Sequence, residues 1–392
     1  MRPGARLQAA IEILDEVIAA ARDAGPAADT VLEKQFRARR YAGSSDRRAI
    51  TDLVWRAIRH SGERPGSGRA ALLALLEAES PELLPGFDGS AHAPAPVAAG
   101  EPRARGSLAP AWLMPRLAAS LGEGLDAELA ASLARAPLDL RINRLKVPDP
   151  EAVRAALPFP AKPVEGLPLP LPFALRAAAG ERPGPEALIR QGLVEVQDAG
   201  SQLVAAVAAA RPGETVVDLC AGAGGKTLAL AADMGGQGRL IACDTDRARL
   251  SRLSPRAARA GATVEARLLD PGREMAALAD LENAADLVLV DAPCSGSGTW
   301  RRNPELRWRL TEARLAALVA LQARLLGIAA RLVRPGGRLV FAVCSLLGEE
   351  GPAQAQAFTG EAPGFRPGSF LRLGPAAHGC DGFFVASWFR DC

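Results

Sequence analysis

The chain has few of the residues that build metal sites or disulfide frameworks. Its 392 residues include six cysteines and three histidines. The cysteines form no CxxC pair and have no histidine partners at ligand spacing, which argues against zinc and against disulfides. An apolar run of about 18 residues is missing, so no membrane span is expected, and the first residues lack the apolar core of a secretory signal. These features favour a protein of the reducing cytoplasm.

An excess of charge of one sign is also missing. The 47 Lys and Arg residues nearly balance 44 acids, for a net charge of +3, so a site for a polyanion requires local clustering. Such a cluster lies between Lys34 and Arg64, where nine basic residues accompany three acids. It is typical either of a solvated helix face or of a phosphate-contacting surface, with Tyr41 and Trp55 as stacking partners.

The length of the chain predicts two or three domains, and the first is expected to be helical. Residues 1–125 carry apolar residues at intervals of three and four, as in Leu7, Ile11, Leu14 and Val17. This spacing predicts an all-α domain.

Two further regions follow. Residues 126–194 begin with the alternating stretch LDLRINRLK, which predicts a strand in a small α/β module. From residue 195 to residue 392, short apolar runs alternate with helical stretches. Near-continuous apolar strands interleaved with helices predict an α/β domain with a mostly parallel, doubly wound sheet.

A glycine-rich turn, DLCAGAGGKT, follows the first strand predicted in this last region. Gly222, Gly224 and Gly225 let the backbone approach a ligand closely at a helix N-terminus. A dinucleotide fingerprint needs a further glycine where Thr227 stands, and the glycine spacing of a P-loop is also missing. The turn therefore indicates a ligand without a phosphate chain, such as S-adenosylmethionine.

Acids at the ends of the next strands support a nucleoside-type ligand. Asp244 ends the second strand, about twenty residues after the turn, where a carboxylate accepts hydrogen bonds from a ribose diol. Asp270 ends the third strand, where it could accept from an adenine amino group. Each acid alone is as well explained by a helix N-cap, but the combination with the glycine turn favours a cofactor.

Two cysteines follow neighbouring strands of the predicted sheet. Asp291-Ala292-Pro293-Cys294 ends one strand, and Cys344 ends the next in the stretch LVFAVCS. Since adjacent strands lie ~5 Å apart, both thiols are expected beside the cofactor crevice. A single cysteine is more often a small buried hydrophobe. Two cysteines at neighbouring strand ends, each in a turn of small residues, favour a catalytic role.

At this point the residues resemble a known family. The motifs DLCAGAGGKT, DAPCSGSGTWRRNPE and VCS, with VQDAGSQL and HGCDGFF, resemble those of the Sun/RsmB (NOP2/Sun) family of RNA cytosine-5 methyltransferases. The basic stretch FRARRYAGSSDRRAITDLVWRAIR resembles the NusB-like RNA-binding domain of its RsmB branch. The chain departs from the family pattern at Gly222-Ala223 and at Val343, where a threonine is usual. Neither change removes a group that the chemistry needs.

The resemblance implies a Rossmann-like, class I S-adenosylmethionine-dependent methyltransferase that acts through a covalent adduct. In this mechanism Cys344 is the nucleophile that adds to cytosine C6, and Cys294 assists release. Asp291 holds the base edge near N3 or contacts the methionine end of the cofactor. Lys226 supplies positive charge to the site or contacts a phosphate.

The resemblance also implies binding residues. The cofactor residues are Cys220, Ala221, Gly222, Ala223, Gly224, Gly225 and Lys226 for the methionine moiety, Asp244 for the ribose, Asp270 for the adenine, and Asp291. The RNA contacts are Arg37, Arg39, Arg40, Arg47, Arg48, Arg141, Asn143, Arg301 and Arg302, with Arg307 and Arg309 in the same cluster as the last two. A solvated helix start is the alternative for that cluster.

The expected substrate is single-stranded or hairpin RNA, because an in-strand base must be flipped out to be methylated. Within the RsmB branch this is 16S rRNA, with tRNA left open. A monomer without metal and without an obligate protein partner is expected. Three alternatives remain: a DNA cytosine-5 methyltransferase with Cys294 as nucleophile, a non-catalytic RNA-binding assembly factor, and a small-molecule methyltransferase.

Overall fold

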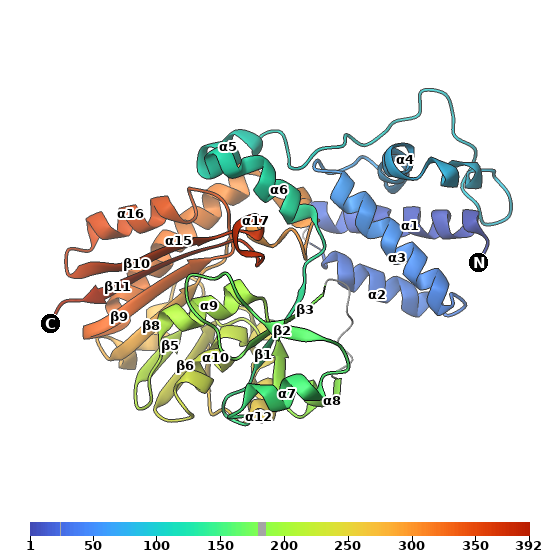
Figure 1. Cartoon of the computed structure of the whole chain (residues 1–392). Coiled ribbons are helices and arrows are strands. Elements are labelled where there is room, and N and C mark those ends of the chain that lie inside the picture. The colour runs from blue at the N-terminus through green and yellow to red at the C-terminus, as the bar shows by residue number, and fades with distance from the viewer. Residues whose placement is uncertain (24, 179–185) are drawn as a thin grey trace. The chain divides into compact units, whose positions relative to one another are not determined.

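The computed structural model describes residues 1–23, 25–178 and 186–392 (Figure 1). These residues form two compact units. The first comprises residues 1–134 and 299–312, and the second comprises residues 135–298 and 313–392. The chain therefore leaves the second unit at Thr299 and returns to it at Ala313.

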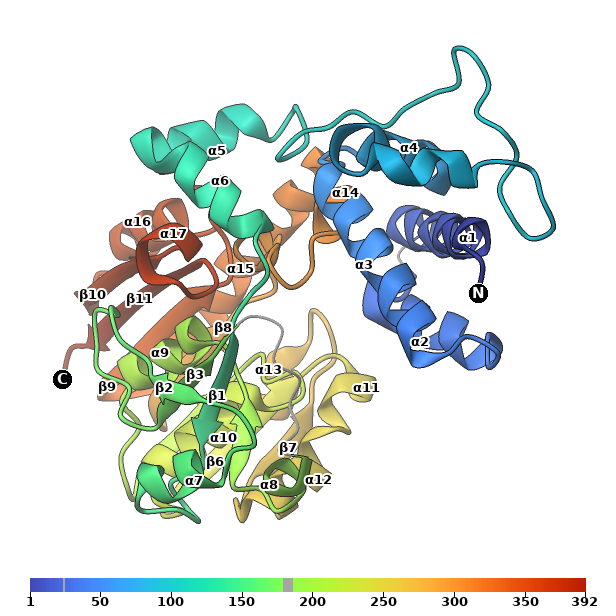
Figure 2. The same cartoon turned by 45° about the vertical axis from the view of Figure 1, so that its right-hand side comes forward.

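The described residues of the first unit form helices, with one isolated β-bridge between Ser61 and Gly106. Its elements are α1 (Pro3–Arg22), α2 (Ala28–Ala38), α3 (Ser44–His60), α4 (Gly68–Glu79), η1 (Pro81–Gly86), α5 (Met114–Leu121), η2 (Gly122–Gly124), α6 (Leu125–Leu133) and α14 (Leu306–Arg309). Helices α1, α3 and α4 pack together around a buried apolar core (Figure 2). The predicted all-α N-terminal region is confirmed, and its likeness to NusB stays a prediction.

A four-stranded antiparallel sheet opens the second unit. Its order is β2 (Ala161–Pro163), β3 (Ala174–Ala177), β1 (Leu138–Ile142) and β4 (Val194–Val196), accompanied by α7 (Pro150–Ala156) and α8 (Glu186–Arg190). The strand predicted from LDLRI is present, but all five of its residues are buried. Alternation along the sequence therefore does not mark a solvated face here, because both faces of β1 are covered. The division of the chain at residues 125 and 194 stays a prediction.

The seven-stranded sheet of the second unit has the order β10-β11-β9-β8-β5-β6-β7. Its strands are β5 (Thr215–Asp218), β6 (Arg239–Asp244), β7 (Glu265–Leu268), β8 (Ala285–Asp291), β9 (Val333–Val343), β10 (Phe365–Leu373) and β11 (Phe383–Arg390). Strands β5 to β9 pair in parallel, whereas β11 pairs antiparallel with β9 and with β10. The mostly parallel sheet is confirmed, and β10 is a strand that the sequence analysis missed.

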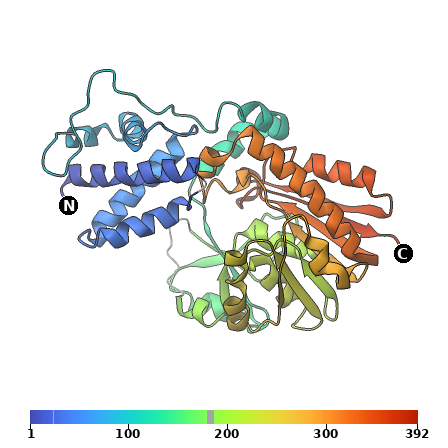
Figure 3. The ribbon, with the colours of Figure 1, turned by 180° about the vertical axis from the view of Figure 1, so that it is seen from behind.

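Helices cover both faces of this sheet. They are α9 (Ala199–Ala208), α10 (Gly225–Asp233), α11 (Arg247–Leu250), α12 (Leu253–Ala260), α13 (Glu274–Leu278), α15 (Glu312–Leu332), α16 (Pro352–Glu361) and α17 (Pro375–His378), with η3 (Ala279–Leu281) and η4 (Ser297–Thr299). Helices α13, α15 and α16 share one apolar cluster with the sheet, and α9 and α10 share another. Figure 3 shows the face covered by α15. The fold is therefore doubly wound.

Helix α15 is the one described helix that is long and apolar enough to cross a membrane by length and composition. Its residues Leu325, Leu326, Ala329 and Leu332 are buried against the sheet. A core helix of a soluble protein has the same composition, and the packing of α15 fits that explanation.

Candidate functional site

The candidate active site lies where the parallel strands end. Strand β8 pairs with β5 on one side and with β9 on the other. Cys294 comes three residues after β8, and Cys344 directly follows β9. The expectation that these cysteines follow neighbouring strands is confirmed.

The two thiols are in direct contact. The Sγ atoms of Cys294 and Cys344 lie 3.3 Å apart, within hydrogen-bond distance for sulfur, and both thiols are free. The hydrogen bond with Cys344, followed by burial, raises the pKa of Cys294 well above its ordinary value. Ionisation of Cys294 is therefore disfavoured beside Cys344.

A buried ion pair lies beside the cysteines. Lys226 Nζ lies 2.7 Å from Asp291 Oδ2, and the ammonium group stands over the ring of Phe383 at 5.2 Å. Burial lowers the pKa of Lys226. Asp291 and, to a smaller extent, Cys344 raise the pKa by more than burial lowers it, so the pKa is raised overall. The side chain is therefore a fixed positive charge that acts on the Cys344 sulfur.

The glycine turn after β5 has the geometry that requires glycine. Gly222 and Gly224 have φ of 56° and 87°. A Cβ on Gly224 would also lie 2.2 Å from Leu253 Cδ1, so a substitution there would strain the backbone and displace the Leu253 side chain. Helix α10 begins at Gly225 and points its N-terminus toward the strand ends.

The acid that ends β6 is oriented by this turn. The backbone N–H of Gly222 donates to Asp244 Oδ2 at 2.7 Å, and that of Asp246 donates to Oδ1 at 2.7 Å. A carboxylate has about four acceptor positions, so Asp244 retains capacity for a ribose diol. Asp270 is exposed two residues after β7. Its position is compatible with an adenine contact.

One acid of this region was missed by the sequence analysis. Asp218, the last residue of β5, is 1% exposed and accepts a hydrogen bond from Thr227 Oγ1 at 2.6 Å. Burial raises its pKa to about 7, although the hydrogen bond from Thr227 lowers it. Its place in DLCAGAGGKT was visible in the sequence, but its burial was not.

Comparison with known proteins places this site in a family. Residues 205–389 match the model of the family described as 16S rRNA methyltransferase RsmB/F. The chain is 36% identical over 302 residues to a probable ribosomal RNA small subunit methyltransferase B of Synechocystis, covering 71% of this chain and 66% of that protein. It is 33% identical over 299 residues to the ribosomal RNA small subunit methyltransferase B of Erwinia tasmaniensis, covering 72% and 67%. The chain belongs to the RsmB/F methyltransferase family.

Solved structures agree with this family assignment. The crystal structure of PH0851 superposes with a TM-score of 0.76 at 25% identity, covering 97% of this chain and 98% of that one. A methyltransferase homolog from Pyrococcus horikoshii gives 0.62 at 25% identity, covering 72% and 96%. The second unit thus has the Rossmann-like methyltransferase fold. The curated relatives above are longer than the part matched, since the chain spans about two thirds of their length.

The RsmB/F family uses S-adenosylmethionine, and the residues present fit this cofactor. The turn from Cys220 to Lys226 leaves a side-chain-free approach at Gly222, where an added Cβ would meet open space. Asp244 stands at the end of the neighbouring strand. The order of β5, β6 and β7 in the sheet brings Asp270 to the same edge. The structure therefore agrees with a nucleoside cofactor lying across these strand ends.

Two of the RNA contacts predicted for this RsmB/F chain are contradicted by burial. Arg141 is 7% exposed and donates to Gln197 Oε1 at 2.6 Å and to the Leu228 carbonyl. Asn143 is 3% exposed and donates to the carbonyls of Gly192 and Ala260. Both side chains use their donors inside the second unit, so the predicted RNA contacts at these positions are wrong.

Most arginines of the cluster that follows the Cys294 loop are buried or donate hydrogen bonds within the protein. Arg301 and Arg307 are 6% and 1% exposed, and Arg309 donates to the carbonyls of Gly25 and Pro26. Arg302 is partly exposed. Burial contradicts a backbone contact by Arg301 or Arg307, and a solvated helix start is equally wrong for them.

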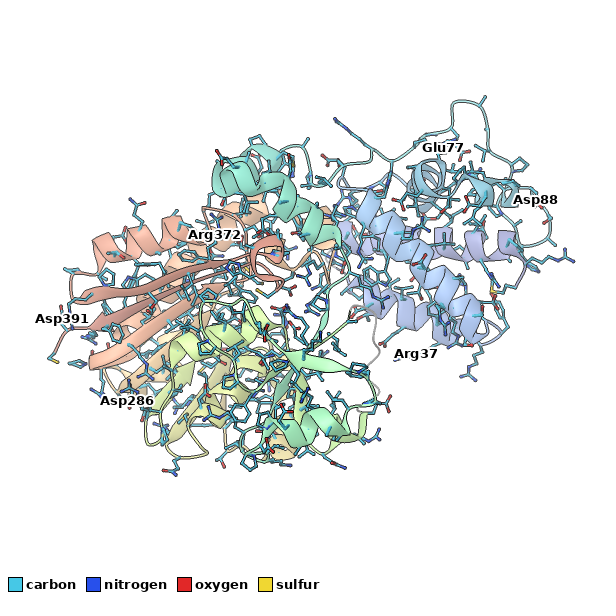
Figure 4. The ribbon with its side chains drawn as sticks, in the orientation of Figure 1. Arg37, Glu77, Asp88, Asp286, Arg372 and Asp391 are labelled. Atoms are coloured by element: carbon cyan, nitrogen blue, oxygen red, sulfur yellow. The ribbon has the colours of Figure 1, made fainter. Side chains whose placement is uncertain are left out.

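The basic residues of α2, of α3 and of the segment between them remain candidates for RNA contact, with differences among them. Arg37, labelled in Figure 4, has an 81% exposed side chain, and Arg40 and Arg48 are also exposed. Arg39 is held by Glu12 and Gln35. Arg47 donates to the Ala42 carbonyl at 2.9 Å. The exposed members are therefore the better candidates.

A metal site is not found in the part of the chain that the structure describes. No group of three or more His, Cys, Asp or Glu side chains is arranged to hold an ion there.

Proposed function

We propose that the chain is an S-adenosylmethionine-dependent methyltransferase that methylates C5 of a cytosine in 16S rRNA. The single observation that supports this reaction best is the contact of two free thiols, 3.3 Å apart, at the ends of β8 and β9. Cytosine C5 is a poor nucleophile, and a thiolate that adds to C6 makes C5 nucleophilic. One thiol serves addition and the other serves release.

The cofactor residues have separate tasks in this proposal. S-adenosylmethionine, when bound, supplies the electrophilic methyl group. The turn from Cys220 to Lys226 binds its methionine moiety, Asp244 binds the ribose hydroxyls, and Asp270 accepts from the adenine. Asp291, held by Lys226 at 2.7 Å, fixes the base edge near N3.

Cys344 is the nucleophile in this proposal because the surroundings of the two thiols differ. The positive charge of Lys226 acts on the Cys344 sulfur, and a neighbouring cation is typical of a catalytic cysteine. Cys294 has its pKa raised by Cys344, by burial and by the charge of Glu350, which keeps it as a thiol. The different neighbours of the two sulfur atoms therefore support separate roles for them.

The proposed reaction passes through a covalent adduct. Cys344 Sγ forms a bond to C6, and C5 would take the methyl group as the sulfonium–methyl bond breaks, which leaves the thioether S-adenosylhomocysteine. C5 then loses its proton to water, and the Cys344–C6 bond breaks to restore the aromatic ring and return the Cys344 thiolate. Cys294 stands within contact distance of the Cys344 sulfur and assists this last step.

The test replaces each cysteine in turn. We expect Cys344→Ala to abolish both the RNA adduct and methylation, because no thiolate remains to add to C6. Cys294→Ala is expected to accumulate covalent RNA, because release is impaired. Gel-shift of the denatured protein–RNA adduct and methyl transfer from labelled cofactor measure the two outcomes. Cys392→Ala, which removes an exposed thiol outside the pair, is the control.

The reverse pattern, with the adduct lost in Cys294→Ala, would assign the nucleophile as in DNA cytosine-5 methyltransferases. Absence of cofactor binding in calorimetry would favour a non-catalytic assembly factor. Bisulfite sequencing of rRNA and tRNA from cells lacking the protein identifies the substrate. We propose that the helical region, as a NusB-like domain, binds that RNA.

A further inference from the structure

A buried carboxylate contacts the two loops that carry the cysteines. Glu350, in the segment between β9 and α16, is 0% exposed. A buried carboxylate is costly unless its oxygens are hydrogen-bonded. Neither the family resemblance nor the sequence pattern predicts a role for this residue.

The hydrogen-bond donors to Glu350 come from both cysteine loops. Ser295, which follows Cys294, donates its backbone N–H to Oε1 at 2.7 Å and its hydroxyl to Oε2. Ser345, which follows Cys344, donates its hydroxyl to Oε2 at 2.6 Å. One carboxylate therefore accepts from the residue next to each thiol.

Further bonds close the same network. Ser297 Oγ lies 3.0 Å from Ser345 Oγ and accepts from the Leu346 N–H at 2.9 Å. Gln322 on α15 donates to Glu350 Oε1 at 3.1 Å and to the Pro293 carbonyl at 2.9 Å. The two loops are thus joined to each other and to a core helix.

The chemistry of the donors explains why a carboxylate stands here. The donors around Glu350 are an amide N–H, a side-chain amide and two hydroxyls, all neutral. An ionised carboxylate only accepts, so it satisfies all of them at once. A glutamine of the same shape would present an NH₂ group to part of this set.

We propose that Glu350 is a positioning residue that ties the Cys294 loop to the Cys344 loop and thereby sets the spacing of the two sulfur atoms. This role rests on the proposed function for its catalytic meaning, but the spacing itself can be measured without activity. The charge of Glu350 also acts on Cys294, so its removal is expected to change the titration of that thiol.

The first test measures the spacing directly. Diamide oxidises two neighbouring thiols to a disulfide and is itself reduced to the hydrazine, and the Cys294–Cys344 peptide is quantified by mass spectrometry. We expect the wild-type protein to cross-link rapidly, because its sulfur atoms are 3.3 Å apart. Glu350→Ala is expected to cross-link at least about tenfold more slowly, since the loops lose their common acceptor.

The second test uses the isosteric variant Glu350→Gln. We expect a fall in kcat on the order of 100-fold, because small displacements of reacting groups have effects of this size, with the KM for the cofactor unchanged. The pH midpoint of Cys294 alkylation is expected to fall, since the neighbouring negative charge is gone. A role in stability alone would leave that midpoint in place.

The matched control is Glu214→Gln. Glu214 is also a little-exposed carboxylate, paired with Arg338 at 2.7 Å, but it precedes β5 at the opposite end of the strands. It is expected to leave cross-linking and the alkylation midpoint unchanged. If Glu350→Ala does not fold, Ser295→Ala and Ser345→Ala each remove one hydroxyl donor and should slow cross-linking without leaving an unfilled cavity.

Wild-type rates of cross-linking and of methyl transfer in folded Glu350 variants would overturn the proposal. If the wild-type protein cross-links rapidly and the variants slowly, but no RNA is methylated, the positioning role stands and the proposed function fails. The two conclusions are therefore separable.

Discussion

At the residue scale, burial changes the titration of Asp218 in a way that its neighbours in sequence do not reveal. Its carboxyl group is enclosed at the end of β5, with Thr227 as the donor to one oxygen. Burial raises its pKa from 3.8 to about 7. The folded protein therefore keeps a proton that the unfolded chain releases near pH 4.

This difference predicts a pH dependence of stability. The stabilising contribution is complete below about pH 4, where both states are protonated, and is lost as the pH rises through about 7. The Asn side chain of Asp218→Asn does not titrate. The unfolding free energy of the variant minus that of the wild type should therefore increase by roughly 4 kcal/mol between pH 4 and pH 8. Urea unfolding at several pH values measures this gain.

Asp286→Asn is the control with the opposite sign. Asp286, at the other end of β8 and labelled in Figure 4, keeps a lowered pKa. Burial alone would raise it, but the Thr215 N–H and Arg334 outweigh burial. This variant should therefore be less stable than the wild type by a constant amount above about pH 4, and the deficit should shrink as the pH falls below about 4, where the contribution of Asp286 is lost. Parallel curves for both variants would contradict the assignment.

Residues at strand ends could be predicted from the sequence, and buried polar residues could not. Cys294, Cys344 and Asp244 follow apolar runs, so the sheet alone determines where they meet. Glu350 and Asp218 depend on donors that arrive from other segments. Arg141 looked like the polar side of an alternating strand, but both faces of β1 are buried, and a single strand's pattern does not show what covers it.

At the element scale, the segment from Thr299 to Glu312 belongs to the first unit although it directly follows the Cys294 loop. Arg307 donates to the carbonyls of Ile58 and Arg59 at the C-terminus of α3 and to that of Leu108. Trp308 Nε1 donates to the Ser61 carbonyl at 2.8 Å. The segment therefore caps α3, satisfying carbonyls that a helix end leaves free.

Replacing Arg307 should loosen α3 in particular. Burial lowers the pKa of Arg307 to about 9, and the Arg59 charge adds to this effect. Arg307→Ala removes the donor to four carbonyls, those of Ile58, Arg59, Leu108 and Pro304, at about 1–3 kcal/mol each before relaxation. We expect on the order of 100-fold faster amide exchange in α3, measured by hydrogen–deuterium exchange, and no change with Arg40→Ala, an exposed arginine of the same unit.

Unchanged exchange in Arg307→Ala would show that the segment is only a passive neighbour of α3. The sequence could not reveal this capping role, because the α3 carbonyls of Ile58 and Arg59 lie 249 and 248 positions earlier in the chain. Arginines in such a segment look solvated when only their own helix is considered. Strand β10 was missed for a related reason: its run contains Pro367 and Gly368 and has a register shift opposite β11.

At the scale of the whole molecule, the fold of the second unit was more predictable than its boundaries. Near-continuous apolar strands and the glycine turn were enough to predict the parallel sheet and its ligand edge. The return of residues 299–312 to the helical unit leaves no mark in composition. Domain division depends on which surfaces pack, and packing is a property of the assembled chain.

The exposed arginines of the helical unit predict a measurable effect on RNA affinity. Arg37, Arg40 and Arg48 together, each replaced by alanine, should weaken binding of the rRNA substrate and reduce the slope of log affinity against log salt by about 2, since each phosphate contact on single-stranded RNA contributes about 0.7. Cofactor affinity and the rate at saturating RNA should be unchanged, because the cysteine pair is untouched.

The control for this charge change is Arg190→Ala with Arg366→Ala, two arginines of the second unit with side chains 70% and 72% exposed. If that pair lowers the salt slope as much per charge as the helical trio does, binding depends on net charge alone. A smaller effect from the control, combined with a uniform loss of affinity across RNA sequences in the trio, would assign α2 and α3 to the phosphate backbone. The exposed ring of Tyr41, 72% accessible beside them, then becomes the residue to test for base stacking.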